Sequence, residues 1–188
     1  MEAVLKKEII INKTLCRFIG VLVFVILTSL GAFVRIPLPF TPVPLTLQTF
    51  FILLCGAFLG SRLGVTAQLS YVFLGILGLP VFTGASSGLG YLYGPTGGYI
   101  FGFILAVLFI GRFIKYTQSK LISVFVVLFL GDLILLLCGA VWLKLLLGIT
   151  LGKSLLIGFL PFIPGDLLKA LVASGIYLKL KKRIREVF

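Results

Sequence analysis

The chain has 188 residues, of which 60% are hydrophobic and only 12% are charged, and its mean hydropathy is +1.25. A soluble domain carries about 25% charged residues, so this composition excludes a conventional soluble catalytic core. The net charge of +12 does not indicate a nucleic-acid partner, because the basic residues cluster at the ends of apolar runs. We therefore predict one all-α domain embedded in a lipid bilayer, covering residues 1–188.

Apolar runs that are long enough for six membrane-spanning helices fill the chain, since each crossing needs about 20 residues. Four prolines between residues 37 and 44 exclude a continuous helix after the first run. A Gly-Ser-Arg sequence at 60–62 predicts a tight link, which makes the second and third runs an antiparallel helix pair. Pro161 and Pro164-Gly165 interrupt the last run. The predicted spans are residues 18–34, 45–60, 63–79, 99–111, 121–142 and 155–178.

The distribution of lysine and arginine predicts the orientation in the membrane, because positive charge is kept on the cytoplasmic side. The connections on one side carry 13 basic residues, whereas those on the other carry only Arg35, Lys144 and Lys153. We therefore predict a multi-pass protein of the bacterial cytoplasmic membrane with both termini in the cytoplasm. The proline-rich segment 36–44 and the glycine-rich segment 80–98 then lie together on the outer side.

Two charged residues of the last predicted span indicate a ligand site. Ionisable side chains within a span are costly and usually mark a functional position. Asp166 and Lys169 are three residues apart after the Pro164-Gly165 break, so both lie on one helical face with the acid nearer the N-terminus. The pair could simply neutralise itself inside the bundle. However, a helix broken beside it exposes free backbone N–H groups, which favours a small polar or anionic ligand.

Asp132 is the other charged residue within a predicted span. It follows a glycine in the fifth span and could be a second ligand group, or a structural partner of a loop lysine such as Lys144. We favour the structural role.

The two outer segments can complete the site. The proline-rich segment is stiff and can act as a lid, whereas the glycine-rich segment is flexible and its backbone can approach a ligand closely. Neutral hydrogen-bonding groups lie nearby, among them Thr46 and Thr96, and aromatic rings can stack on an apolar ring. Taken singly, each of these is explained equally well by packing or interfacial anchoring. The candidate ligand-binding residues are Asp166, Lys169, Gln48, Tyr91, Tyr99, Ser86 and Ser87, and the candidate gating residues are Phe40, Pro42 and Pro44.

The sequence carries no candidate catalytic or metal site. It has no histidine, which removes the commonest general base and metal ligand. Its three cysteines, Cys16, Cys55 and Cys138, are far apart and lack metal-binding spacing. Residues 152–154 read Gly-Lys-Ser but lack the upstream glycine of an ATP-binding Walker A motif. We expect no enzyme activity, no metal, no cofactor and no ATP hydrolysis by this chain.

Four blocks of the sequence follow one another in a known order and spacing. They are I-P-L-P-F-T-P-V-P-L-T-L-Q-T at 36–49, G-I-L-G-L-P-V-F at 75–82, G-L-G-Y-L-Y-G-P-T-G-G-Y at 88–99 and F-I-P-G-D-L-L-K-A at 162–170. Together they resemble the BioY family of biotin transporters over about residues 18–180.

The resemblance implies the substrate-binding S component of an energy-coupling factor (ECF) transporter, a six-helix protein that captures biotin outside and delivers it inward. The partners implied are biotin, a transmembrane coupling subunit and two cytoplasmic ATPase subunits, which alone use ATP. In that family an aspartate and a lysine of the sixth helix contact biotin, and they map onto Asp166 and Lys169. Small residues spaced four apart on the first helix, which serve docking in such components, are reduced here to Thr28 and Ala32.

Three other functions compete with this interpretation. An S component for a different vitamin would share the fold and differ in its site, but the Asp166 and Lys169 pair beneath the glycine-rich segment favours biotin. A membrane-embedded hydrolase would need a base or metal set beyond two spaced acids. A small channel or membrane scaffold would show no saturable ligand binding.

Overall fold

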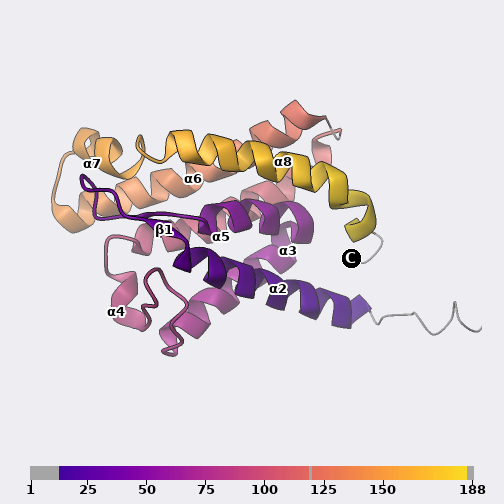
Figure 1. Cartoon of the computed structure of the whole chain (residues 1–188), viewed down its shortest axis with the longest axis horizontal. Helices are drawn as coiled ribbons and strands as arrows, with labels where there is room; N and C mark the ends of the chain where they lie inside the picture. Colours follow the sequence, from indigo (N-terminus) through magenta and orange to yellow (C-terminus); the bar gives the residue numbers. More distant parts are fainter. Residues whose placement is uncertain (1–12, 119, 186–188) are drawn as a thin grey trace, which may run out of the picture.

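Long helices running along one direction make up most of the structure (Figure 1). The computed structural model describes residues 13–118 and 120–185. Many large apolar side chains face outward, as expected when lipid covers the surface; Phe18 is 64% exposed and Ile122 is 77% exposed. The elements, labelled as in Figure 1, are α2 (Lys13–Phe33), β1 (Arg35–Ile36), β2 (Leu45–Thr46), α3 (Gln48–Ile76), α4 (Leu89–Leu92), α5 (Gly97–Phe113), the 3₁₀ turn η1 (Ile114–Tyr116), α6 (Leu121–Leu147), α7 (Leu151–Gly158) and α8 (Ile163–Arg185).

Helix α3 consists of two antiparallel arms, residues 48–59 and 61–76. Gly60 joins them with φ 72° and ψ −174°, a backbone conformation that essentially only glycine adopts. The Nε2 of Gln48 donates a hydrogen bond to the hydroxyl of Tyr71 at 2.8 Å, although 23 residues of straight helix would separate the two by about 35 Å. The predicted antiparallel pair is therefore present, and one glycine makes the turn.

The last predicted span is interrupted at Pro161, as predicted, but not at Pro164-Gly165. Helices α7 and α8 meet at 52° across residues 159–162, which include Pro161. Pro164 lies instead in the first turn of α8, where a residue needs no backbone N–H and the proline ring fits. Asp166 is consequently in the first turn of α8, close to the partial positive charge of the helix N-terminus.

The other helix ends differ from the predicted spans by a few residues. Helix α6 continues to Leu147 because no residue breaks it before Gly148, which adopts the left-handed conformation with φ 63°. The second arm of α3 ends at Ile76, before Gly78 with φ 102°. The predicted spans 18–34, 45–60, 63–79, 99–111, 121–142 and 155–178 correspond to helical residues 13–33, 48–59, 61–76, 97–113, 121–147 and 151–158 with 163–185.

Glycines of α5 allow close contact with α6. A Cβ atom on Gly98 would lie 2.1 Å from the Cβ of Trp142, and one on Gly102 would lie 2.8 Å from the carbonyl oxygen of Leu135. Small residues four apart let two membrane helices approach in this way. The glycine pair therefore packs within the chain, and it brings Leu135 toward the core between α5 and α6.

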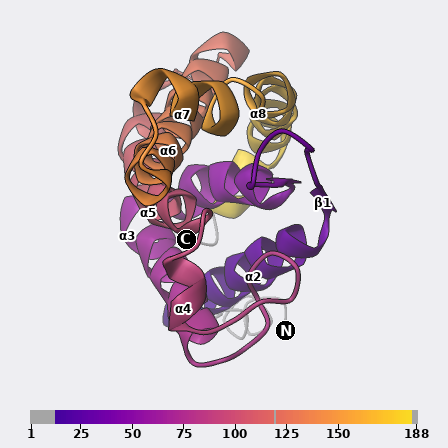
Figure 2. The ribbon, with the colours of Figure 1, turned by 90° about the vertical axis from the view of Figure 1, so that its left-hand side faces the viewer.

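The two ends of the bundle differ in structure. The terminal end, as we call it, holds the start of α2, the end of α8 and η1 (Figure 1). The loop end, which faces the viewer in Figure 2, holds the β1–β2 ribbon, α4 and α7. In the antiparallel ribbon Arg35 lies opposite Thr46 and Ile36 lies opposite Leu45. The proline-rich segment connects these two strands and therefore forms a short hairpin at the loop end.

The glycine-rich segment, which was expected to be flexible, is packed against the bundle. Phe82 is completely buried beneath Gly75, where a Cβ atom would lie 2.1 Å from the phenyl ring. Its ring stacks on Tyr91 with centroids 4.9 Å apart. At the other end of the segment, the indole N–H of Trp142 donates to the carbonyl oxygen of Gly94 at 2.9 Å. Helices α3 and α6 thus hold the segment at two points.

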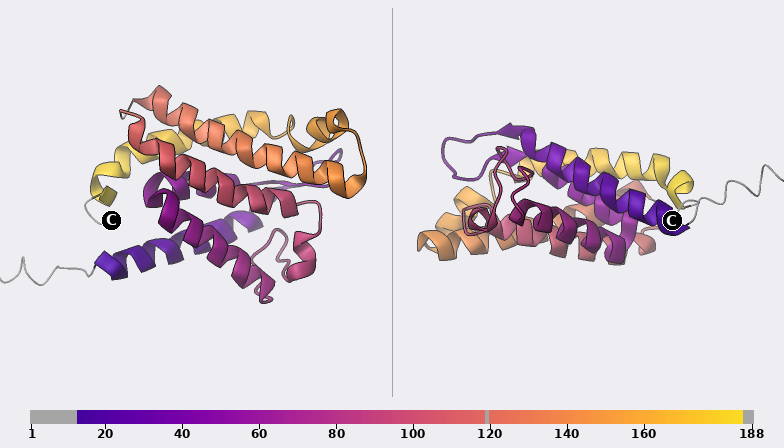
Figure 3. Two further views of the ribbon diagram at one scale, coloured as in Figure 1. Left: turned by 180° about the vertical axis from the view of Figure 1, so that it is seen from behind. Right: turned by 90° about the horizontal axis from the view of Figure 1, so that it is seen from below.

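The long helices run between the terminal end and the loop end, as Figure 3 shows from two further sides. Among the described residues, four helices are long and apolar enough to cross a membrane, and the bent α7–α8 pair raises this number to five. Helix α3 counts once in that number although its two arms run in opposite directions. Counting both arms gives six segments, which agrees with the six predicted spans.

The reversal at Gly60 leads to a stability prediction. Replacing Gly60 with alanine should lower the free energy of unfolding by about 1–3 kcal/mol, because alanine must adopt a strained backbone conformation. No atom lies within 4 Å of the position of the added Cβ, so the effect reports strain and not a clash. Thermal unfolding in detergent measures it. Gly175→Ala is the matched control, since its surroundings are equally open and its backbone is helical; equal melting temperatures for both variants would contradict the prediction.

Candidate functional site

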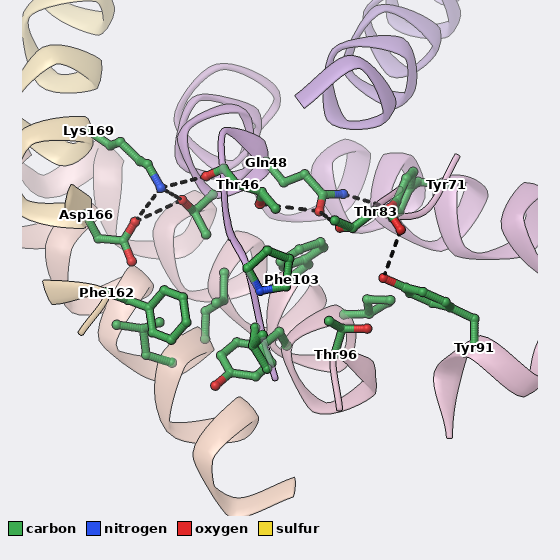
Figure 4. Close-up of a pocket in the computed structure, with 17 residues that line it drawn as sticks. Thr46, Gln48, Tyr71, Thr83, Tyr91, Thr96, Phe103, Phe162, Asp166 and Lys169 are labelled. Atoms are coloured by element: carbon green, nitrogen blue, oxygen red, sulfur yellow. Dashed lines mark hydrogen bonds and ion pairs between the residues drawn. The ribbon is translucent and has the colours of Figure 1, made fainter. Parts of the chain in front are cut away.

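A cavity at the loop end is lined by charged, amide and hydroxyl side chains together with aromatic rings (Figure 4). About 500 Å³ of space lies between the atoms of its wall, a figure that includes the opening to solvent. The β1–β2 ribbon, both arms of α3, the glycine-rich segment, α5, α6 and the start of α8 contribute to its wall. The lining residues are Val43, Pro44, Thr46, Gln48, Thr49, Tyr71, Thr83, Tyr91, Thr96, Tyr99, Ile100, Phe103, Leu135, Leu136, Phe162, Asp166 and Lys169.

A buried ion pair occupies one side of the cavity. The Nζ of Lys169 lies 2.8 Å from Oδ1 of Asp166, and the side chains are 12% and 1% exposed. The same ammonium donates to the carbonyl oxygen of Thr46 at 2.7 Å and to the hydroxyl of Thr49 at 2.8 Å. All three N–H donors of the ammonium therefore have acceptors, as a charge buried in a membrane protein requires.

Asp166 keeps one oxygen available for a ligand. Its Oδ1 accepts from Lys169 and, at 3.0 Å, from the hydroxyl of Thr49. Its Oδ2 is buried and accepts no bond from an N–H or hydroxyl donor among the described residues, and the only polar neighbour left to it there is the carboxyl of Asp132. Because a buried carboxylate oxygen without a donor is costly, this atom indicates a place where a ligand N–H group would be stabilised.

A hydrogen-bonded chain of neutral groups lies across the cavity from the ion pair (Figure 4). The amide nitrogen of Gln48 donates to the hydroxyl of Tyr71 at 2.8 Å, and that hydroxyl donates to the carbonyl oxygen of Val81 at 3.2 Å. The hydroxyl of Thr83 donates to Oε1 of Gln48 at 3.1 Å. These bonds fix the orientation of the Gln48 amide and connect both arms of α3 with the glycine-rich segment.

Apolar and aromatic side chains form the rest of the wall. The rings of Tyr99 and Phe162 lie 6.0 Å apart at an angle of 56°, and the Tyr99 hydroxyl is bonded to the carbonyl oxygen of Gly158 in α7. Phe103 and Leu135 are buried beside them. A flat or puckered apolar ring would therefore be enclosed by aromatic faces between two polar ends.

The structure brings five of the seven predicted ligand residues together. Asp166, Lys169, Gln48, Tyr91 and Tyr99 all line the cavity. No part of Ser86 or Ser87 does: the segment folds back with the N–H of Phe82 bonded to the carbonyl oxygen of Ser86, and Ser87 is exposed. The expected hydroxyl from this segment comes instead from Thr83.

The three predicted gating residues lie at different depths. Pro44 lines the cavity itself, whereas Pro42 lines only a shallower outer hollow. Phe40 is 58% exposed and contributes to neither. Of the proline-rich segment, Val43 and Pro44 therefore cover the ligand space, and the tip around Phe40 projects beyond it.

The sequence interpretation missed several lining residues. Thr49 follows Gln48 directly, and its hydroxyl contacts both charges of the ion pair. The spacing Thr46-x-x-Thr49 at a helix start was a usable signal, because residues three apart share a helical face. Tyr71 and Phe103 gave no such signal, since both lie in long apolar runs typical of packing residues.

Asp132 lies beside the ion pair and not beside Lys144. Its carboxyl is completely buried in α6, neither oxygen has a hydrogen-bond partner among the described residues, and its electrostatic neighbours are Asp166 and Lys169. Lys144 is exposed and 12 residues farther along the same helix, about 18 Å away. The suggested pairing with Lys144 is therefore wrong.

The arrangement is suited to binding and not to reaction. It offers one compensated charge pair, neutral hydroxyl and amide groups, and an apolar wall. Within the described part of the chain, no group of three histidine, cysteine, aspartate or glutamate side chains is placed to hold a metal ion.

The chain is similar to known biotin transporters in sequence and in structure. Residues 6–186 match the model of the BioY family. A probable biotin transporter BioY of Pyrococcus horikoshii is 42% identical over 156 residues, 81% of this chain and 88% of that protein. The biotin transporter BioY of Thermotoga maritima is 39% identical over 167 residues, 85% of this chain and 92% of that protein.

A solved structure supports the same comparison. The crystal structure of an S-component for biotin from an ECF-type ABC transporter superposes with a TM-score of 0.86 and 30% sequence identity. It covers 92% of this chain and 94% of the other. The predicted all-α, multi-pass membrane fold is thereby confirmed.

Substitution by asparagine is expected to change the stability of the fold differently at the two buried aspartates. Asp166→Asn leaves the Lys169 ammonium without its counter-charge and should lower the free energy of unfolding by roughly 3–5 kcal/mol. Asp132→Asn removes a carboxyl that has no cation of its own and should leave stability unchanged or raised. Thermal unfolding of the ligand-free protein in detergent compares them. Equal losses in both variants would contradict this assignment of the charges.

Proposed function

The chain belongs to the BioY family, and on this premise we propose that it is a biotin transporter: the S component that binds biotin at the outer side of the cytoplasmic membrane and delivers it inward. The observation that carries the proposal is the Asp166–Lys169 pair in a cavity that is otherwise neutral: within the part of the chain that the structure describes, Oδ2 of Asp166 receives no N–H or hydroxyl donor. A transporter, in contrast to an enzyme, needs only such a selective and reversible contact.

Biotin matches the polar groups of the cavity. Its ureido ring carries two N–H donors and one carbonyl acceptor, so it needs both hydrogen-bond polarities at one end. Asp166 accepts from a ureido N–H through Oδ2, and Lys169 donates to a ligand oxygen by exchanging one of its bonds to Thr46 or Thr49. The hydroxyls of these threonines take part in the same exchange.

The apolar part of biotin matches the remaining wall. The thioether bicycle and the aliphatic chain carry no hydrogen-bonding groups of their own, and they require apolar surroundings. Tyr99, Phe103 and Phe162 supply aromatic faces at the depth of the ion pair, and Leu135 with Leu136 closes the cavity on the α6 side.

We propose that transport requires partner subunits, namely a transmembrane coupling subunit and two cytoplasmic ATPase subunits. The likeness to an S-component from an ECF-type ABC transporter supports this assembly. The sequence itself has no Walker A motif, so another chain must supply ATP hydrolysis. Helix α2 packs mainly on α3 and presents Phe18, Leu22 and Ile26 outward, which leaves a membrane-facing helix for a partner to contact.

The proposed orientation places the loop end outside and the terminal end in the cytoplasm. Basic residues such as Arg112 and Lys115 cluster at the terminal end, while Lys144 and Lys153 are at the loop end together with Arg35. The excess at the terminal end follows the rule that positive charge remains inside. The cavity then opens toward the outer medium, where biotin is captured.

Calorimetric titration of the detergent-purified chain with biotin tests the function. We expect saturable binding by the wild type and a loss of affinity of about 100-fold or more in Asp166→Asn and Lys169→Met, since each leaves a buried charge unpaired. Lys153→Met, at an exposed position of the loop end, is the control and should bind as the wild type does. A folded wild type that ignores biotin and binds another vitamin would indicate an S component of different specificity.

The proline-rich segment is proposed to close over bound biotin. Val43 and Pro44 line the cavity. Contacts between these residues and a bound ligand should therefore bring the proline-rich segment closer to the glycine-rich segment. Spin labels at Leu38 and Ser86, in a background lacking the native cysteines, should move closer and give a narrower distance distribution when biotin is added. Labels at Arg62 and Ile122, away from the loop end, serve as the control pair. A separation of Leu38 and Ser86 that ignores biotin would exclude the lid.

A further inference from the structure

Among residues 13–118 and 120–185, Arg35 is a cation without a partner, and it lies at the opening of the cavity. It is exposed, and within the described residues its guanidinium makes no hydrogen bond and no ion pair. The side chain lies over Gly84, where a Cβ atom would come within 2.5 Å of Nη1. Gly84 also has a left-handed backbone with φ 78°. Any side chain at position 84 would occupy the space in which the Arg35 guanidinium lies.

The β1–β2 ribbon places Arg35 beside Thr46, a residue that contacts the ion pair. Arg35 is directly opposite Thr46 in the antiparallel ladder, so their side chains share one face of the ribbon. Thr46 lines the cavity, and its carbonyl oxygen accepts the bond from Lys169 at 2.7 Å. Opposite Cα atoms in such a ladder are about 5 Å apart. Arg35 and Lys169 are therefore both immediate neighbours of Thr46.

A shallow outer hollow connects Arg35 with the cavity. Arg35 lines this hollow, and Pro44, Thr83, Tyr91 and Thr96 line both the hollow and the cavity. A ligand seated against Asp166 therefore has a continuous path along these shared residues to the guanidinium.

Charge excludes an anionic group from the inner end and favours it at Arg35. The Lys169 ammonium is already neutralised by Asp166, and Asp132 is a second carboxyl beside them. A ligand carboxylate placed there would find no free cation to pair with, because Asp166 already occupies the Lys169 ammonium. The surface of the described part of the chain carries no carboxylate, because Asp132 and Asp166 are both buried. The guanidinium of Arg35 is therefore available to an anion that arrives from outside.

We propose that Arg35 forms a carboxylate subsite that fixes the direction of the ligand, with the ureido ring inside against Asp166 and the carboxylate outside on the guanidinium. The inference rests on the proposed function and deepens it, since it assigns the ligand oxygen that Lys169 does not bind. A planar guanidinium holds a carboxylate through two parallel hydrogen bonds, and the aliphatic chain of biotin spans the shared residues between the two ends.

Titration with biotin and with biotinol, in which the carboxylate is replaced by a neutral alcohol, tests the subsite. The wild type should bind biotin about 10- to 100-fold more tightly than biotinol, as charge-assisted hydrogen bonds allow. The Arg35→Gln variant should bind biotin about 10- to 100-fold more weakly than the wild type does. Its affinity for biotinol should stay within about threefold of the wild-type value. Arg35→Lys should fall between them, because an ammonium keeps the charge without the planar pair of donors.

Lys153→Gln is the matched control, because it removes the same charge from an exposed position at the loop end that lines neither the cavity nor the hollow. It should leave the preference for biotin over biotinol unchanged. Equal weakening of both ligands by Arg35→Gln, or a wild type that does not distinguish them, would overturn the subsite while leaving biotin binding intact. A wild type that binds neither ligand would instead refute the proposed function.

Discussion

The hydrogen bonds of the Lys169 ammonium determine how the loop end is assembled. A charge buried in a membrane protein is tolerated only when acceptors surround it, and here they come from Asp166 in α8, Thr49 in α3 and the backbone of Thr46 in β2. Thr46 and Thr49 are 123 and 120 residues from Lys169 along the chain. One side chain thus fastens the ribbon and two helices to one another, and the cavity exists because these three elements meet around it.

Two irregularities in the helices place polar groups at the cavity beside Lys169. The break at residues 159–162 starts α8 at the cavity and places Asp166 in its first turn, where the helix dipole favours a carboxylate. The reversal at Gly60 returns α3 to the loop end, so that Tyr71 bonds Gln48 across the hairpin. Straight helices of the same composition would bury these groups apart from one another. The irregular backbone is therefore what gathers a polar site inside an apolar bundle.

The sequence predicted features that depend on local chemistry and missed those that depend on tertiary contacts. The spacing of Asp166 and Lys169 placed both on one helical face, and the glycine at 60 predicted the hairpin, because neither inference needs the rest of the fold. Tyr71 was missed because a tyrosine in an apolar run is usually a packing residue, and its partner lies on the other arm. Ser86 and Ser87 were predicted in place of Thr83, because the direction of a side chain in the glycine-rich segment depends on the left-handed residues that turn it, Gly84 and Ala85.

The charged groups at the loop end make the inner and outer ends of the site chemically different, which the shape of the cavity alone would not do. Both described carboxyls, Asp132 and Asp166, are inside, and the free guanidinium of Arg35 is at the opening. The inner end offers carboxyl oxygens to N–H donors and has no unpaired cation for an anion, while the guanidinium at the outer end favours anions. A ligand with donors at one end and a carboxylate at the other is aligned in a single direction. With the ligand in the proposed direction, its carboxylate stays at the opening, so the interior of the bundle gains no net charge on binding and the buried ion pair keeps its charge balance.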